Sequence, residues 1–183
     1  MSLYDVSRYV HVVGAMGLFL TLGLEWTGVA RLRDADTADQ ARAWFSVLAV
    51  GRRIGPATLA AVLLPGLYMA WAVWGFVGWV DVALAAVALM AALAAHNGIR
   101  LSNIAQELDE ATGPLPPRLA ARLRNPLFLA SLRSRVGIVL GTVYLMTGKP
   151  DLTGSLLTVG VALGFGLAWA LPAWGRRPEE RPA

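Results

Sequence analysis

The sequence predicts an all-α protein, a polytopic membrane helix bundle with five transmembrane helices. Three observations predict this fold class. Hydrophobic residues make up 56% of the 183 residues and charged residues only 15%, whereas a soluble domain carries about 25% charged residues. The mean hydropathy is +0.55, and the apolar runs reach the length of about 20 residues that a helix needs to cross a bilayer. These runs do not alternate with polar residues, as the strands of a membrane barrel would.

The composition also excludes several classes of function. The chain has no cysteine, which excludes disulfides, thiolate metal sites, iron–sulfur clusters and cysteine nucleophiles. The formal net charge is +4, but the basic residues lie at the ends of apolar runs, which argues for membrane orientation and against nucleic-acid binding. The sequence contains no phosphate-binding loop, dinucleotide fingerprint or hydrolase motif.

The whole chain, residues 1–183, forms a single predicted domain. The first span covers about residues 6–30 and is too long for the apolar core of a signal peptide, so we expect it to be retained. Residues 34–50 then predict a short interfacial helix, with Asp36 or Thr37 as its N-cap. The second span covers about residues 54–79 and contains Pro56 and Pro65, of which Pro65 is expected to kink the helix and free a backbone carbonyl.

The remaining three spans follow after short polar connections. The third span opens at Asp81 and covers about residues 81–104, and a polar loop with a basic amphipathic piece leads to the fourth, at about residues 127–147. The fifth covers about residues 152–174. A four-span alternative would fuse residues 136–174 into one helix, but it would leave Lys149, Pro150 and Asp151 in hydrocarbon.

The positive charges predict how the bundle is oriented. Of the 16 Lys and Arg residues, two, Arg8 and Lys149, fall on one side of the five-span arrangement, and the other 14 fall on the opposite side. Positive residues gather on the cytoplasmic side. We therefore expect a protein of the bacterial inner (plasma) membrane with the N-terminus outside and the C-terminus in the cytoplasm. The 14 residues are Arg31, Arg33, Arg42, Arg52, Arg53, Arg100, Arg118, Arg122, Arg124, Arg133, Arg135, Arg176, Arg177 and Arg181.

His11 is the first candidate ligand of a cofactor or metal, because an ionisable residue inside a membrane span is costly and is a functional hypothesis by default. At about 1.5 Å per residue, His11 lies roughly 9 Å and His96 roughly 22 Å from the outer ends of their spans, so the two are not expected to share one iron. Met146 and Tyr144 lie near the level of His11, and haem iron accepts either a His/Met pair or a single His.

The outer edge of the bundle carries two cations near the same level. Arg8 and Lys149 could receive haem propionates as charge-assisted partners. The alternative is that His11 only forms a hydrogen bond between helices. Met146 and Tyr144 would then be packing residues.

A second group of polar residues falls at a similar depth in the cytoplasmic half of the spans. Glu25 requires a partner, which we expect to be an Arg from the third or fourth span. His96 is a further cofactor-binding candidate in this group, as part of an anion or propionate pocket or of a proton path. The alternative is one structural ion pair with arginines that extend to the interface. The group comprises Glu25, His96, Asn97, Arg100, Asn103, Arg133 and Arg135.

Small residues recur at helical spacing in the last two spans. Gly137 and Gly141 are four residues apart, and so are Gly160 and Gly164. Such pairs let helices approach closely, either within the bundle or in a homodimer.

The layout of the chain resembles a group of small bacterial integral membrane proteins of unknown function. The resemblance rests on Arg8-Tyr-Val-His11-Val-Val-Gly14, on Gly51-Arg-Arg-Ile-Gly-Pro56, on Pro65-Gly66, on a late His in the third span and on Tyr144-Leu-Met-Thr-Gly-Lys149-Pro150-Asp151. It covers roughly residues 5–152. The group is distantly similar to HemJ-like protoporphyrinogen oxidases and to CopD-like copper-resistance membrane proteins.

The HemJ-like resemblance implies haem b bound by the first-helix histidine, which is His11 here, and a Lys-Pro pair that maps to Lys149-Pro150. The stretch Gly78-Trp-Val-Asp81 lacks the basic residue that the family carries early in its third helix, so at this point the chain departs from the pattern of the porphyrinogen oxidases. Two isolated histidines and five scattered methionines give no clustered ligand set for a cuprous ion.

Three functional hypotheses follow from these patterns. The first is a haem b protein with a redox or electron-transfer role, with a quinone or porphyrin as partner, in which haem supplies the chemistry. The second is a cofactor-free accessory or assembly subunit of a larger membrane complex, and the third is a small transporter. Whether the chain is an enzyme, and whether it forms a homodimer, stays open at this stage.

Overall fold

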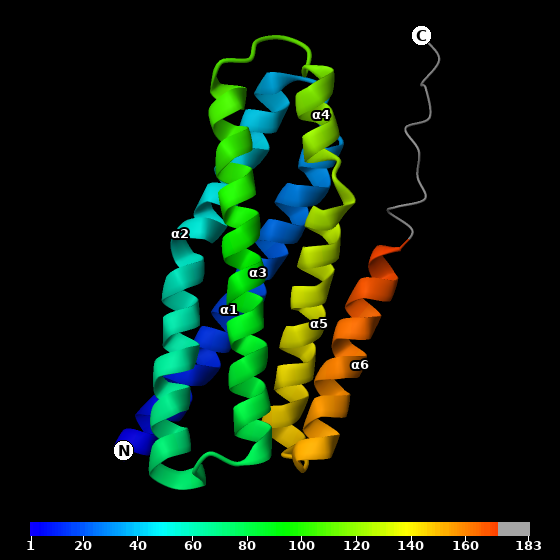
Figure 1. The fold of residues 1–183 in the computed structure, drawn as a ribbon. Coiled ribbons are helices and arrows are strands. Elements are labelled where there is room, and N and C mark those ends of the chain that lie inside the picture. The colour runs from blue at the N-terminus through cyan, green and yellow to red at the C-terminus, as the bar shows by residue number, and fades with distance from the viewer. Residues whose placement is uncertain (172–183) are drawn as a thin grey trace.

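The computed structural model describes residues 1–171, and all the secondary structure elements in this part of the chain are helices. Five of them are long: α1 (Leu3–Arg33), α2 (Ala38–Met69), α3 (Gly78–Asp109), α5 (Pro126–Gly148) and α6 (Leu152–Ala170). A π-helical turn, η1 (Ala70–Trp74), extends α2, and the short α4 (Pro117–Leu123) precedes α5. Figure 1 shows the five long helices side by side as one elongated bundle.

The helices confirm the predicted fold class. Within the described residues, five segments are long and apolar enough to cross a membrane: α1, α2 with η1, α3, α4 with α5, and α6. The 19 residues of α6 rise about 28 Å, close to the hydrocarbon thickness of a bilayer. The predicted end of the fifth span, residues 171–174, and the predicted inner charges Arg176, Arg177 and Arg181 lie outside or at the limit of the described residues.

The prediction of a separate interfacial helix over residues 34–50 is wrong. Thr37 is the N-cap, as expected, but α2 continues through Gly51 and Pro56 without a break. The physical reason lies in α1, because Gly51 and Gly55 both face Thr21 across close helix packing that spans this region. At the other end the second span is shorter than predicted, because the chain leaves the helix at Gly75, which has a positive φ of 70°.

Two tight helix pairs make up most of the bundle. α1 packs mainly on α2, and α5 mainly on α6. A Cβ atom at Gly14 would lie 2.8 Å from the Ala61 carbonyl carbon, and one at Gly137 would lie 2.2 Å from the Ala162 oxygen. Such distances mean that the two backbones touch, so these positions require glycine.

The glycine pairs of the last two spans therefore split between two roles. Gly137 and Gly141 contact Ala162 inside the bundle, whereas Gly160 and Gly164 have no described protein atom within 4 Å of the position that a Cβ would take and face outward. The sequence left open whether these pairs serve the bundle or a homodimer, and Gly160 and Gly164 lie on the face of α6 where a second copy could approach.

One end of the bundle is closed by a compact cap. The cap comprises residues 32–48 and 101–128. These are the ends of α1 and α3, the start of α2, and α4 with the connections on both sides of it. Leu32, Leu108 and Leu123 are buried there, with at most 3% of each residue exposed. The α1–α2 and α3–α4 connections join through two backbone hydrogen bonds, from Ala38 to Gly113 at 3.0 Å and from Leu115 to Asp36 at 2.9 Å.

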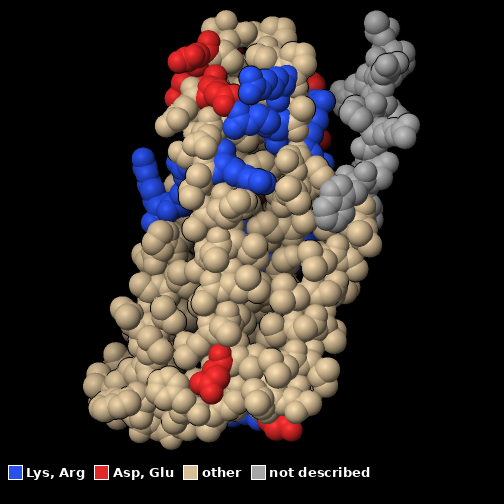
Figure 2. Space-filling view, viewed as in Figure 1, with Lys and Arg blue, Asp and Glu red and all other residues tan. Residues whose placement is uncertain are grey.

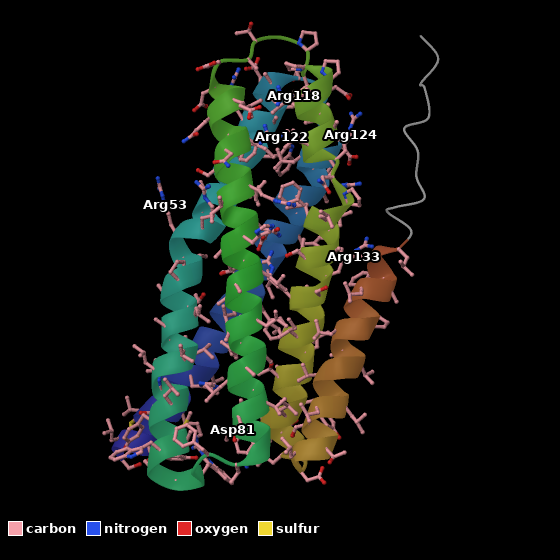
Figure 3. The ribbon with its side chains drawn as sticks, viewed as in Figure 1. Arg53, Asp81, Arg118, Arg122, Arg124 and Arg133 are labelled. Atoms are coloured by element: carbon pink, nitrogen blue, oxygen red, sulfur yellow. The ribbon has the colours of Figure 1, made fainter. Side chains whose placement is uncertain are left out.

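The charges lie mainly at the cap. In Figure 2, Lys and Arg gather at the end of the bundle that holds α4, and the opposite half shows few charges. Figure 3 places Arg118, Arg122 and Arg124 at the cap and Asp81 near the other end. We call that other end, with the start of α1, η1 and the α5–α6 connection, the open end.

Candidate functional site

The half of the bundle next to the open end contains a cavity of about 410 Å³. We call it the His11 cavity. Its walls come from α1, α2, α3 and α5, and they are mostly apolar. This size lies within the range of about 300–1,000 Å³ that is typical of small-molecule and cofactor sites.

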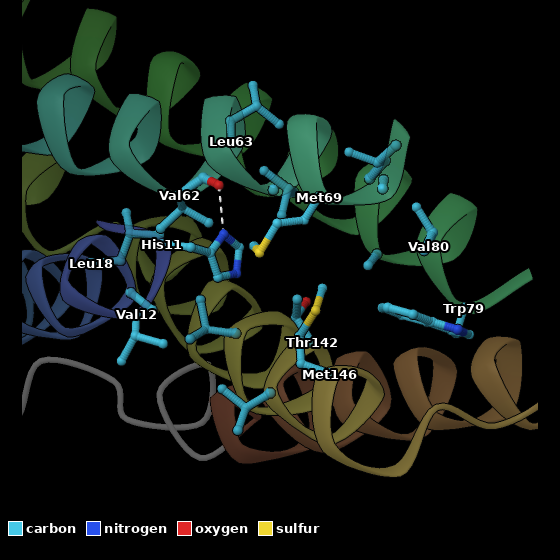
Figure 4. Close-up of a pocket in the computed structure, with 18 of the residues that line it drawn as sticks. His11, Val12, Leu18, Val62, Leu63, Met69, Trp79, Val80, Thr142 and Met146 are labelled. Atoms are coloured by element: carbon cyan, nitrogen blue, oxygen red, sulfur yellow. Dashed lines mark hydrogen bonds between the residues drawn. The ribbon is translucent and has the colours of Figure 1, made fainter. Parts of the chain in front are cut away.

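His11 projects into this cavity from α1 (Figure 4). Its Nδ1 lies 2.7 Å from the carbonyl oxygen of Val62 on α2. A carbonyl oxygen can only accept a hydrogen bond, so Nδ1 carries the proton and donates. In a neutral ring with the proton on Nδ1, the free electron pair is on Nε2.

Glycines on both helices explain why His11 reaches the backbone of α2. Gly14, one turn after His11, lets α1 touch α2 at Ala61 and Val62. Gly66 lies against the His11 ring, where a Cβ would be 3.2 Å from both Nδ1 and Cε1. The ring is therefore held against α2 by a backbone hydrogen bond and by contact with a glycine surface.

This arrangement is typical of a histidine that ligates a metal. Metal-ligating histidines almost always donate their other ring N–H to a carbonyl or carboxylate, which fixes the tautomer and the ring orientation. In this protein the Val62 carbonyl has that position relative to His11. The arrangement can also serve as a plain hydrogen bond between helices, the alternative that the sequence left open.

Three of the five methionines line the same cavity. Met69 comes from the end of α2, Met90 from α3 and Met146 from α5. Figure 4 shows the side chains of Met69 and Met146 on the cavity side of the helices that face His11. The methionines are thus gathered around one cavity, although they are scattered along the sequence.

The mouth of the cavity is basic and aromatic. Arg8, Lys149, Tyr4 and Trp74 all line it. The ammonium nitrogen of Lys149 lies 3.9 Å from the centre of the Trp74 ring. Arg8 lies near Tyr4 and is 3.8 Å from Asp5, with 64% of its side chain exposed. Both cations are thus placed where an anionic group at the cavity mouth could reach them.

The structure brings together four of the six predicted site residues. His11, Met146, Arg8 and Lys149 all line the His11 cavity, whereas Tyr144 and His96 do not. Tyr144 is 56% exposed on the outer face of α5. His96 is exposed on α3, and it has no hydrogen-bond partner among the described residues.

The predicted inner polar group contains an ion pair and a separately buried Asn97, which is 3% exposed, whereas His96 and Asn103 are exposed. Glu25 and Arg135 form a two-fold hydrogen-bonded ion pair, with 2.7 Å between Arg135 Nη1 and Glu25 Oε2. Their side chains are 18% and 3% exposed, which confirms the prediction of an Arg partner for Glu25. Arg133 instead stacks on the Trp26 and Trp169 rings at 5.6 and 5.0 Å and donates to the Trp169 carbonyl.

Sequence reasoning missed Val62, Met69 and Met90 as residues of the site. Val62 contributes only a main-chain oxygen, which no side-chain pattern signals. The helical spacing could have pointed to Met69. Val62, Gly66 and Met69 recur at i, i+4 and i+7 and so lie on one face of α2. The spacing alone does not show that this face of α2 packs against α1, and this contact is what brings Met69 close to His11.

No family model, curated protein or solved structure matches this chain. Within the described residues, no group of three or more His, Cys, Asp or Glu side chains could hold a metal ion. A site with one histidine, completed by a macrocycle or by thioethers, falls outside that kind of group.

Proposed function

We propose that this protein binds haem b in the His11 cavity, with His11 as axial ligand, and that it has a redox or electron-transfer role. The observation that carries the proposal is the hydrogen bond from His11 Nδ1 to the Val62 carbonyl, which directs the free electron pair of Nε2 away from α2. Haem, when bound, would supply one-electron chemistry.

The residues present fit this group. Apolar walls from four helices would surround the macrocycle, and Met69 or Met146 could provide a second, thioether ligand. Arg8 and Lys149 at the mouth are positioned to pair with propionates. The Val62 hydrogen bond would fix the His11 ring orientation and leave Nε2 as the ligating atom.

The decisive experiment is an absorption spectrum of the purified protein, oxidised and dithionite-reduced, after expression with ample haem. We expect a Soret band and reducible α and β bands that disappear in His11→Ala. His96→Ala is the matched control, because His96 lies outside the cavity, and it should keep the spectrum. The absence of haem bands in the wild type, or their equal loss in both variants, would contradict the proposal.

A second candidate function follows from the three methionines around His11. Thioether and imidazole ligands select cuprous ion, so the same cavity suits copper binding or transfer. Elemental analysis of the purified protein separates the two candidates. Copper retained without haem bands, and lost in Met69→Leu with Met146→Leu, would favour copper, whereas haem bands that survive this double substitution would indicate His11 as the sole protein ligand.

We further propose that the chain lies in the bacterial inner membrane with its cap in the cytoplasm. The charge distribution supports this orientation, since basic residues gather at the cap. The sequence has no cysteine, so single cysteines can be introduced without background. A membrane-impermeant maleimide should label Asp151→Cys and not Glu110→Cys in intact spheroplasts, and the reverse pattern would invert the orientation.

If neither haem nor copper is found, the remaining hypotheses are a cofactor-free assembly subunit and a small transporter. Quinone or porphyrin as redox partner belongs to the haem proposal. A bound or released porphyrin would be recognised by its own fluorescence in the same preparations.

A further inference from the structure

A second cavity of about 400 Å³ lies next to the His11 cavity, further toward the cap. We call it the α2–α3 cavity, because α2 and α3 contribute most of its walls. Leu18 and Met90 line both cavities and therefore form their common boundary. Nothing in the proposed haem site uses this second space.

The α2–α3 cavity is apolar and reaches the lateral surface of the bundle. Gly98 lines it and has no described protein atom within 4 Å of the position that a Cβ would take, so no side chain fills the space there. Pro56 and Ala95 also line the cavity, and both are exposed in segments apolar enough to cross a membrane. In a bilayer this side of the cavity faces acyl chains, and its walls suit a hydrocarbon tail.

The interior of the cavity carries no unbalanced charge. Glu25 and Arg135 line it, but they bond to each other through two hydrogen bonds. The charges of the pair compensate each other, so the interior does not attract an ion. A preference for one class of ligand therefore has to arise at the entrance.

The entrance carries uncompensated positive charge. Arg52 lines the cavity and is exposed, and the neighbouring Arg53 is exposed as well. Figure 3 shows Arg53 extending from α2 away from the bundle. Neither arginine has an ion pair with a carboxylate among residues 1–171. Arg42, Arg122 and Arg124 in the cap each have such a partner. Arg52 and Arg53 are thus available to an anion outside the protein.

The position of Arg52 along α2 matches the level of lipid phosphates. Trp74, at the far end of η1, follows Arg52 by about 22 residues, which corresponds to a rise of about 33 Å. This length slightly exceeds the hydrocarbon thickness of about 30 Å. Tryptophan is typical of a membrane interface, so with Trp74 at one interface Arg52 lies at the other.

We propose that this entrance binds the phosphate of an anionic phospholipid through Arg52 and Arg53, with one acyl chain in the α2–α3 cavity. Arginine forms charge-assisted hydrogen bonds with phosphate oxygens, and basic pockets between membrane helices bind anionic headgroups. A zwitterionic lipid has the same phosphate and tail, but its own amine offsets the negative charge. The proposal goes beyond the redox function proposed above and does not require haem in the His11 cavity.

The test is native mass spectrometry of the purified protein in detergent, titrated with phosphatidylglycerol or with phosphatidylcholine of identical acyl chains. The two probes differ only in the headgroup. We expect one saturable site that binds phosphatidylglycerol at least about fivefold more tightly. Equal affinities would mean that the cavity takes any lipid tail, and they would overturn the proposal.

Arginine substitutions test the headgroup contact. Arg52→Gln should weaken phosphatidylglycerol binding about fivefold, and Arg52→Gln with Arg53→Gln should abolish the preference over phosphatidylcholine. Arg118→Gln is the matched control, because Arg118 is also exposed and has no ion pair with a described carboxylate, but lies on α4 in the cap (Figure 3). Equal weakening by Arg118→Gln would indicate attraction by net charge alone, and it would overturn the proposed site.

Two matched glycine substitutions test the place of the tail. Gly98→Leu should place a side chain into the α2–α3 cavity, whereas Gly160→Leu adds the same side chain to the open outer face of α6. We expect Gly98→Leu to weaken the binding of phosphatidylglycerol several-fold and Gly160→Leu to leave it unchanged. Wild-type affinity in a Gly98→Leu protein that keeps its helical circular dichroism would overturn the proposal.

The same variants separate this proposal from the haem proposal. His11→Ala should keep the preference for phosphatidylglycerol, because His11 does not line the α2–α3 cavity. Arg52→Gln and Gly98→Leu should keep any haem spectrum, because neither residue lines the His11 cavity. Either proposal can therefore fail without the other.

Discussion

The cap and the rest of the bundle differ in how completely their side chains fill the interior. In the cap, buried side chains such as Ile104, Leu108 and Leu123 leave 1–3% of their surface exposed. Arginines there bond to helix ends, as when Arg42 donates to the carbonyls of Leu108 and Ala111 at 2.9 Å each. The rest of the bundle instead contains the His11 cavity, a second cavity lined by Glu25 and Arg135, and a backbone-fixed histidine.

This difference suggests a division between scaffold and site. The ends of α1, α2, α3 and α5 are fixed relative to one another in the cap, so they need not pack fully against one another further along. The tight α1–α2 and α5–α6 pairs then act as two walls with space between them. Binding sites held by rigid elements in this way keep their geometry without a filled core.

The largest expected effect comes from the ion pair between the two regions. Glu25→Ala would leave Arg135 buried and unpaired, and breaking such a pair costs about 3–5 kcal/mol. The free energy of unfolding in mixed detergent micelles, followed by circular dichroism, measures this loss. The double variant Glu25→Leu with Arg135→Met should recover most of the stability, and equal instability of both variants would contradict the argument.

The next largest loss of unfolding free energy is expected when a leucine of the cap is shortened, and a leucine beside a cavity provides the comparison. Leu108→Ala removes a fully buried side chain and should cost about 2–5 kcal/mol. Leu84→Ala removes the same atoms from the wall of the His11 cavity, where Leu84 is only half-buried, and should cost less than about 1 kcal/mol because fewer contacts are lost. Equal losses in the two variants would show that the cavity is filled or collapsed in the membrane.

A smaller effect is expected where two helices touch through glycine. Gly137→Ala would place its Cβ 2.2 Å from the Ala162 oxygen, and we expect a loss of about 1–3 kcal/mol as α5 and α6 separate. Gly160→Ala meets no described protein atom and should stay within about 1 kcal/mol of the wild type. The difference between the two unfolding free energies is the measurement, and a strongly destabilising Gly160→Ala would instead indicate that a partner covers α6.

The sequence was sufficient to predict the five spans because each is a continuous apolar run whose ends carry charges or turn residues. The Glu25–Arg135 pair was also predictable, since an isolated carboxylate in a membrane is too costly to remain without a cation. The break expected near Gly51 was wrong because Gly and Arg signal helix ends only when the helix is isolated. In the structure α1 supports α2 throughout this region.

The cavities could not be predicted, because they depend on how far α2 stands from α3. Local sequence shows that Gly55 and Gly98 are small but not whether another helix fills the space beside them. The same limit explains Met69 and Met90, whose place near His11 follows from the tilt of whole helices. Sequence patterns thus pointed to His11, Met146, Arg8 and Lys149, whereas Val62, Met69 and Met90 required the structure.

The smallest expected effect lies on the surface of the cap. Arg122 and Glu107 form an ion pair whose side chains are 35% and 51% exposed. Exposed pairs contribute about 0–1 kcal/mol because water and salt screen them, so Glu107→Gln should lower the unfolding free energy by less than about 1 kcal/mol. The difference from the wild type should shrink further between low salt and about 1 M salt, where screening acts over about 3 Å. A salt-independent loss above about 2 kcal/mol would mean that this pair belongs to the buried scaffold of the cap, and the boundary between the cap's core and its surface would then have to move outward.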